Sequence, residues 1–155
     1  MIPEFKSLNP EEAQLMLDAP ALLTILIAGV EGEIDNKEKD WAVRIAQFRA
    51  RDRHSIMQNY YEEVSGHFNE TLESLLKTLP KDTEERSKYI INELKKINNI
   101  IPKLDKKFAS EFYKGYLAFR VQVAKASGGL WGYGSISREE QKIIDMEILK
   151  PPKED

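Results

Sequence analysis

Residues 104–123 read LDKKFASEFYKGYLAFRVQV, and their large apolar side chains recur every three or four positions. This spacing places them on one face of an α-helix, because a helix completes a turn about every 3.6 residues. The row comprises Leu104, Phe108, Phe112, Tyr116, Phe119 and Val123. An aromatic row at helical spacing is typical of a helix that packs into a core, so we predict a core helix and no ligand site here.

Helix start and stop signals extend this pattern to the rest of the chain. Capping boxes pair an N-cap side chain with an acid three residues later, and they are predicted at Asn9/Glu12, Asp35/Glu38 and Ser137/Glu140. Breaks are expected at Pro20, Gly66, Pro80 and Pro102. These signals predict about seven helices, including a short one over 10–18, a second apolar one after Pro20 and others from about 35, 52, 82, 104 and 137.

The helix predicted from Asp35 has its own apolar row. Trp41, Ile45 and Phe48 are spaced by four and three, while Ala42 and Ala46 allow close packing beside them. We therefore expect this row to face the core. No segment of the chain alternates with a period of two for long enough to predict a strand. The expected fold is a single all-α domain over residues 1–149, followed by a disordered tail over 150–155.

Composition excludes several classes of protein. The 155 residues contain no cysteine and only two histidines, His54 and His67, which excludes a disulfide scaffold, a thiolate metal site and a cysteine nucleophile. The net charge of −3 argues against a dedicated nucleic-acid binder. No serine, lysine or acid pair forms a coherent catalytic set, so an enzyme is not expected, and an unrecognised hydrolase is the remaining alternative.

The charges are unevenly distributed along the chain. Residues 1–40 hold nine acids against three lysines, a net of −6, and residues 95–125 hold eight bases against two acids, a net of +6. Two solvated faces of one domain would explain this pattern, and a polarised molecule with separate partner surfaces is the alternative. The longest apolar run, residues 19–30, is too short to span a membrane and no signal peptide is visible, so we expect a cytoplasmic protein.

One turn sequence occurs twice. Residues 32–38, GEIDNKE, are echoed by residues 134–140, GSISREE, and both place a glycine and an isoleucine before an N-cap. Each copy follows an alanine-containing apolar helix. The repetition predicts two helix–turn–helix units related by an internal repeat.

With these residues the chain resembles the TerB-like family, the all-helical module of bacterial tellurite-resistance and related stress systems. The first copy, Glu31-Gly32-Glu33-Ile34-Asp35-Asn36-Lys37-Glu38, differs from the family signature only in glutamate for the leading aspartate. The second copy keeps Glu140 but has lost its leading acids. The resemblance covers roughly residues 20–148, and it implies a non-catalytic cytoplasmic module with a stress-related role whose acidic turns bind a divalent cation.

The candidate cation ligands are Glu31, Glu33, Asp35, Glu38 and Glu140. Carboxylate oxygens suit Ca²⁺ or Mg²⁺, although backbone carbonyls or water would have to complete the shell. The alternative is that Asp35 and Glu38 act only as a helix cap, because acids are favourable at a helix N-terminus without any metal.

Two further groups are candidate partner contacts. Trp131 and Tyr133 lie in a glycine-rich insert, where exposed aromatic side chains would suit an interface, or where Trp131 could simply pack onto the core. Arg49, Arg51 and Arg53 would suit a protein partner, a phosphate or, as a peripheral contact, anionic lipid, or they could only complement a helix C-terminus. The alternative function is therefore a helical protein–protein adaptor without any metal site.

Overall fold

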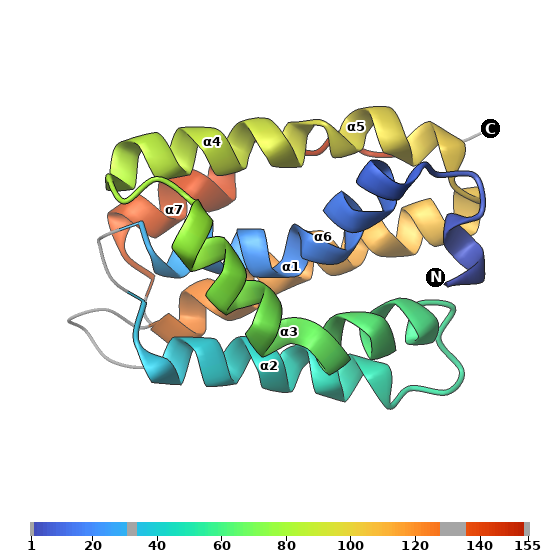
Figure 1. Cartoon of the computed structure of the whole chain (residues 1–155), viewed down its shortest axis with the longest axis horizontal. Helices are drawn as coiled ribbons and strands as arrows, with labels where there is room; N and C mark the ends of the chain where they lie inside the picture. The colour runs from blue at the N-terminus through green and yellow to red at the C-terminus, as the bar shows by residue number, and fades with distance from the viewer. Residues whose placement is uncertain (1, 31–33, 128–135, 154–155) are drawn as a thin grey trace.

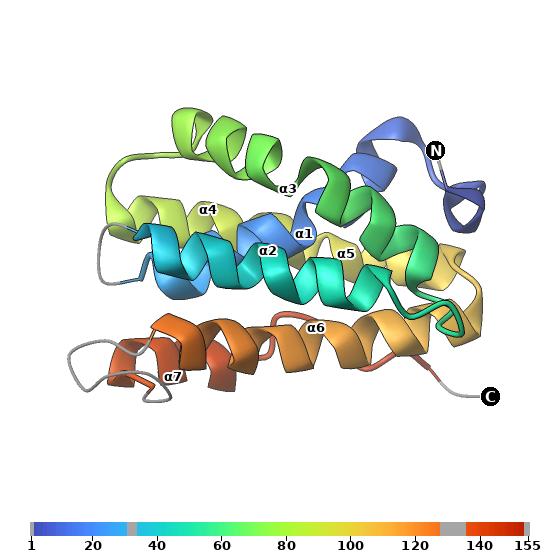
Figure 2. The ribbon, with the colours of Figure 1, turned by 90° about the horizontal axis from the view of Figure 1, so that it is seen from below.

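The computed structural model of the chain describes residues 2–30, 34–127 and 136–153, and every regular element in these ranges is helical. Within these ranges, six α-helices of eight residues or more form a bundle, and the four-residue α5 continues the path of α4 (Figures 1 and 2). The elements are η1 (Pro3–Phe5), α1 (Pro10–Ala28), α2 (Asn36–Ala50), α3 (Gln58–Thr78), α4 (Thr83–Lys95), α5 (Ile97–Ile100), η2 (Ile101–Lys103), α6 (Lys106–Ser127) and α7 (Arg138–Asp145). The all-α prediction is confirmed.

The prediction of two helices on either side of Pro20 is wrong, and this error accounts for the higher helix count. α1 continues through Pro20, whose missing N–H would leave the Met16 carbonyl without its helical partner. The Tyr60 hydroxyl of α3 donates to that carbonyl at 2.5 Å, and the hydroxyl of Thr24 donates to the Pro20 carbonyl at 2.8 Å. The Tyr60 hydroxyl thus supplies the hydrogen bond that the proline removes from the helix.

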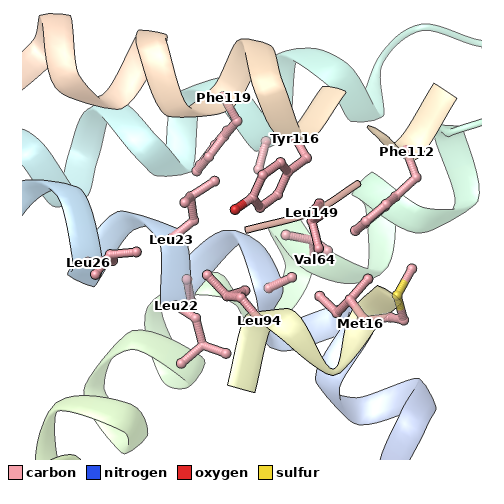
Figure 3. Packing of buried hydrophobic residues seen from close by; sticks show 14 of the residues in the cluster. Met16, Leu22, Leu23, Leu26, Val64, Leu94, Phe112, Tyr116, Phe119 and Leu149 are labelled. Carbon is pink, nitrogen blue, oxygen red and sulfur yellow. The ribbon is translucent and has the colours of Figure 1, made fainter. Parts of the chain in front are cut away.

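α1 is the centre of the bundle. Every residue of α1 from Ala19 to Ala28 is buried, and the helix packs against α3, α4 and α6. The apolar row of α6 is buried as predicted, and in Figure 3 the side chains of Phe112, Tyr116 and Phe119 point from α6 toward α1. A helix that is apolar on all sides requires such surroundings, because each of its faces must be covered.

The predicted helix caps are present in the structure. Asn9, Asp35 and Ser137 each accept from the backbone of an acid three residues later, and that acid accepts from the N-cap backbone in return. Asp82 also caps α4 by accepting from the backbone of Glu85. The internal repeat stays a prediction, because residues 31–33 and 134–135 lie outside the described residues.

The predicted break at Gly66 is wrong. α3 continues from Gln58 to Thr78, and a side chain added at Gly66 would meet nothing within 4 Å, so the glycine sits on an open surface.

The predicted disordered tail begins at Lys150. The backbone N–H of Lys150 donates to the Asn98 side chain at 2.9 Å. Residues 154–155 of that predicted tail lie outside the described residues.

We expect Tyr60→Phe to lower the free energy of unfolding by about 1–3 kcal/mol, because it leaves a buried carbonyl of Met16 without a partner. Tyr116→Phe is the matched control, since the buried Tyr116 hydroxyl has no hydrogen-bond partner among the described residues. Removing it should leave stability unchanged or raise it. Urea unfolding followed by circular dichroism measures both, and equal losses in the two variants would contradict the role given to Tyr60.

The buried tyrosines also predict an alkaline limit to stability. Burial raises the pKa values of Tyr60, Tyr61 and Tyr116 above the ordinary value of about 10. Each hydroxyl therefore holds its proton more tightly in the folded chain than in the unfolded chain. Its contribution to the free energy of unfolding is complete below about pH 10 and is lost as the pH rises further. Urea unfolding between about pH 8.5 and 11 should show this decline. Tyr116→Phe should make the decline shallower.

Candidate protein-docking groove on α2

Phe48 is the most exposed large apolar side chain among the described residues. It is 76% exposed, although Ile45 on the same helix face is only 9% exposed and Trp41 is half-buried. The prediction that the whole row faces the core is therefore wrong at Phe48. Exposed aromatic side chains are favoured anchors of protein interfaces, so this end of the row is a candidate binding surface.

Phe48 borders a groove of about 470 Å³ that lies mainly along α2, called here the α2 groove. Its lining comprises Trp41, Arg44, Ile45, Gln47, Phe48, Arg49, Arg51 and, from α6, Gln122. The apolar members come from positions four and three residues apart, and the arginines flank them on the adjoining helix surface. The groove thus combines three apolar side chains with polar and cationic ones.

The charge of the α2 groove is opposite to that of the whole chain. Three arginines and no carboxylate are among the described residues that line it, whereas the chain has a net charge of −3. The side chains of Arg44 and Arg51 are exposed, and among the described residues neither guanidinium forms a hydrogen bond or an ion pair. The groove can therefore offer two guanidinium groups to a carboxylate of a partner.

Arg49 is different, because its guanidinium connects three helices. It donates to the Tyr61 hydroxyl of α3 at 2.5 Å, to the Gly115 carbonyl of α6 at 3.1 Å and to the Gln122 side chain at 3.0 Å. It also lies over the rings of Tyr61 and Phe119, at 5.0 and 5.7 Å from their centres. Arg49 is one of the predicted partner contacts, and in the structure its half-buried guanidinium is bonded within the fold at the edge of the groove.

Gly115 allows this close packing. A Cβ atom there would lie 3.0 Å from the Tyr61 hydroxyl and 3.2 Å from the Arg49 guanidinium. Burial raises the pKa of the Tyr61 hydroxyl, and the adjacent Arg49 guanidinium opposes part of that rise. The tyrosine therefore stays protonated at neutral pH and accepts from Arg49 through its oxygen lone pairs.

The predicted cation ligands are only partly described. Glu31 and Glu33 lie outside the described residues. Asp35 and Glu38 form the cap of α2, and Glu140, which is 3% exposed, belongs to the cap of α7. Within the described ranges no three histidine, aspartate or glutamate side chains could hold a metal ion together, so these three do not form such a group. The five-residue ligand set stays a prediction.

The remaining predicted partner contacts are also only partly described by the structure. Trp131 and Tyr133 lie outside the described residues, so their part in an interface stays a prediction. Arg51 and Arg53 are both exposed, and Arg51 lines the α2 groove. Sequence reasoning missed Phe48 as a surface residue, although its position seven residues after Trp41, among arginines, was a signal that the apolar row was ending.

The comparisons with known proteins leave the family open. No family model matches the chain, and neither a curated protein nor a solved structure matches it. The TerB-like resemblance therefore stays a prediction that rests on residues 31–38 and 134–140. In the part of the chain that the structure describes, no helix has the length and apolarity needed to cross a membrane.

If Arg49 is structural, Arg49→Lys should lower the free energy of unfolding by about 1–3 kcal/mol, because an ammonium cannot replace the planar guanidinium over two rings and three acceptors. Arg44→Lys is the control on the same helix and should change stability by less than about 0.5 kcal/mol. Chemical unfolding compares them. If both variants are equally stable, Arg49 does not stabilise the fold and is again a candidate for contact with a partner.

Proposed function

We propose that the chain is a non-catalytic helical module that binds a protein partner through the α2 groove. The partner supplies an acidic segment with an apolar anchor. The observation that carries the proposal is the 76% exposure of Phe48 beside a groove lined by three arginines and no described carboxylate. The apolar anchor covers Phe48 and Ile45, while acidic side chains pair with Arg44 and Arg51.

The rigid support of the groove favours this function. Arg49 ties α2 to α3 and α6, so the groove is already formed before a partner arrives. A preformed surface loses little conformational entropy on binding, which raises the affinity that a small contact can reach. The stress-related role and the divalent cation implied by the TerB-like resemblance stay predictions, because no comparison matches the chain and Glu31 and Glu33 lie outside the described residues.

Peptide-phage selection on the full wild-type chain tests the proposal. We expect the selected peptides to share one or two aliphatic or aromatic residues flanked by aspartate or glutamate. Titration of a labelled selected peptide should then show about tenfold or greater weakening by Phe48→Ala, as for an interface anchor. The melting temperature should hardly change, because Phe48 is already exposed.

Tyr89→Ala is the matched control, because Tyr89 is another exposed aromatic side chain, 48% exposed, on α4. It should leave peptide affinity unchanged. Arg44→Glu combined with Arg51→Glu should abolish binding of acidic peptides through charge repulsion. Selected peptides that are basic, or that bind Phe48→Ala as tightly as the wild type, would contradict the proposal.

A further inference from the structure

Four separate segments meet at one end of the bundle. Figures 1 and 2 both place residues 3–8, the α2–α3 connection over 51–57 and the η2–α6 turn over 101–107 at that end, near the C-terminus. Residues 151–153 line a groove together with Lys106 and Lys107 at the start of α6, so they belong to the same end. We call these four segments the basic end.

The basic end is strongly cationic in a chain that is acidic overall. Its four segments contain seven lysines and arginines against three acids, a net of +4, whereas the whole chain has a net of −3. The seven bases are Lys6, Arg51, Arg53, Lys103, Lys106, Lys107 and Lys153. The folding of distant segments to one place produces this concentration, which raises the local potential far above the average of the chain.

Each of the three acids of the basic end accepts a hydrogen bond within the fold. Glu4 accepts from the Asn59 side chain at 3.0 Å. Asp52 accepts from the backbone N–H of His54 at 3.1 Å, and Asp105 accepts from the first backbone N–H groups of α6 at 3.1 and 3.2 Å. All seven bases are exposed, and Lys103 is ion-paired with Glu12 at 2.6 Å. The hydrogen bonds leave the charge of each acid in place, so the four segments keep their net of +4.

Part of the basic end is concave. A groove of about 420 Å³ is lined by four lysines, two prolines and two hydroxyl side chains, with no carboxylate among its described residues. The lining comprises Lys106, Lys107, Ser110, Tyr113, Lys114, Pro151, Pro152 and Lys153. Lysine ammonium groups act as flexible point charges, which suits a diffuse array of anionic groups better than one planar carboxylate.

An exposed aliphatic side chain lies in the same end. Ile56 is 39% exposed and follows Arg53 and His54 in the α2–α3 connection. Basic residues together with an exposed apolar side chain are the features that bind anionic membrane surfaces, where charge attracts the headgroups and the apolar group enters the interface. A nucleic acid bound through its phosphates would use the charges but would leave Ile56 without a role.

We propose that the basic end docks the molecule onto an anionic membrane surface. Ile56 enters the headgroup region, while Arg53, Lys107 and Lys153 lie over the anionic lipids. This attachment is peripheral, and it leaves Trp41 and most of the α2 groove uninvolved, so it does not depend on the function proposed above.

Sedimentation of the full chain with vesicles tests the proposal. The chain should bind vesicles of phosphatidylcholine with about a third phosphatidylserine, and it should not bind pure phosphatidylcholine. Binding should weaken steeply when salt rises from about 0.1 M toward 1 M, because the screening length shrinks from about 10 to 3 Å. No binding to the anionic vesicles at the lower salt would overturn the proposal.

Charge-reversal variants test the surface itself. Each base near an anionic membrane contributes about fivefold to binding, so Arg53→Glu, Lys107→Glu and Lys153→Glu combined should weaken it by on the order of 100-fold or more. Lys77→Glu, Lys88→Glu and Lys142→Glu combined give the control, with the same change in net charge on α3, α4 and α7. The control should keep most of the binding, and equal weakening of both triples would overturn the proposal.

Ile56→Ala separates a membrane from other anionic partners. Shortening an inserted aliphatic side chain should weaken vesicle binding by about fivefold or more while leaving the melting temperature nearly unchanged. If the same variant binds vesicles as the wild type does, Ile56 does not enter the interface and the proposal fails. Binding of a DNA duplex or of polyglutamate, but not of anionic vesicles, would assign the basic end to those partners instead.

Discussion

The hydrogen bond from the Tyr60 hydroxyl satisfies the Met16 carbonyl in the middle of the central helix α1. Pro20 removes the N–H that would otherwise satisfy this carbonyl, and a buried carbonyl without a partner is costly. Tyr60 belongs to α3, so the repair of α1 depends on α3 being in place. The two helices are therefore coupled by a hydrogen bond as well as by apolar packing.

The ring of Tyr60 extends this coupling to the rest of the bundle. It makes edge contacts with Phe5 near the N-terminus, with the neighbouring Tyr61 and with Phe108 and Phe112 of α6, at 5.0 to 6.2 Å between ring centres. Edge contacts between aromatic rings add to the free energy gained by their burial. One side chain thus brings together α1, α3 and the first half of α6.

Arg49 plays the corresponding part for α2. Its guanidinium is held by acceptors on α3 and α6, so the last turns of α2 cannot rotate about their axis without losing these hydrogen bonds. Successive side chains on a helix are about 100° apart, so Phe48 points in a different direction from Arg49. Arg49 thus fixes the end of α2 that carries the candidate groove.

The amino-acid sequence by itself determines the features that depend on residues close together in the chain. The capping boxes at Asn9, Asp35 and Ser137 were predictable because a cap uses groups only three residues apart. The core row of α6 was predictable because its periodicity persists over twenty residues. Both features indicate an all-α fold without knowledge of any tertiary contact.

Only the tertiary structure decided whether the helix continues through Pro20, whether Phe48 is exposed and which groups Arg49 contacts. Periodicity shows that a helix has an apolar face, but it does not show how far a neighbouring helix covers that face. Tyr60 lies 44 positions from Met16, and Gly115 lies 66 positions from Arg49, so no local pattern could have paired them. The basic end arises from such distant pairings, because its segments meet only when the helices pack. The α2 groove lies mainly on one helix, and packing decides it by leaving Phe48 exposed and by placing Gln122 of α6 beside it.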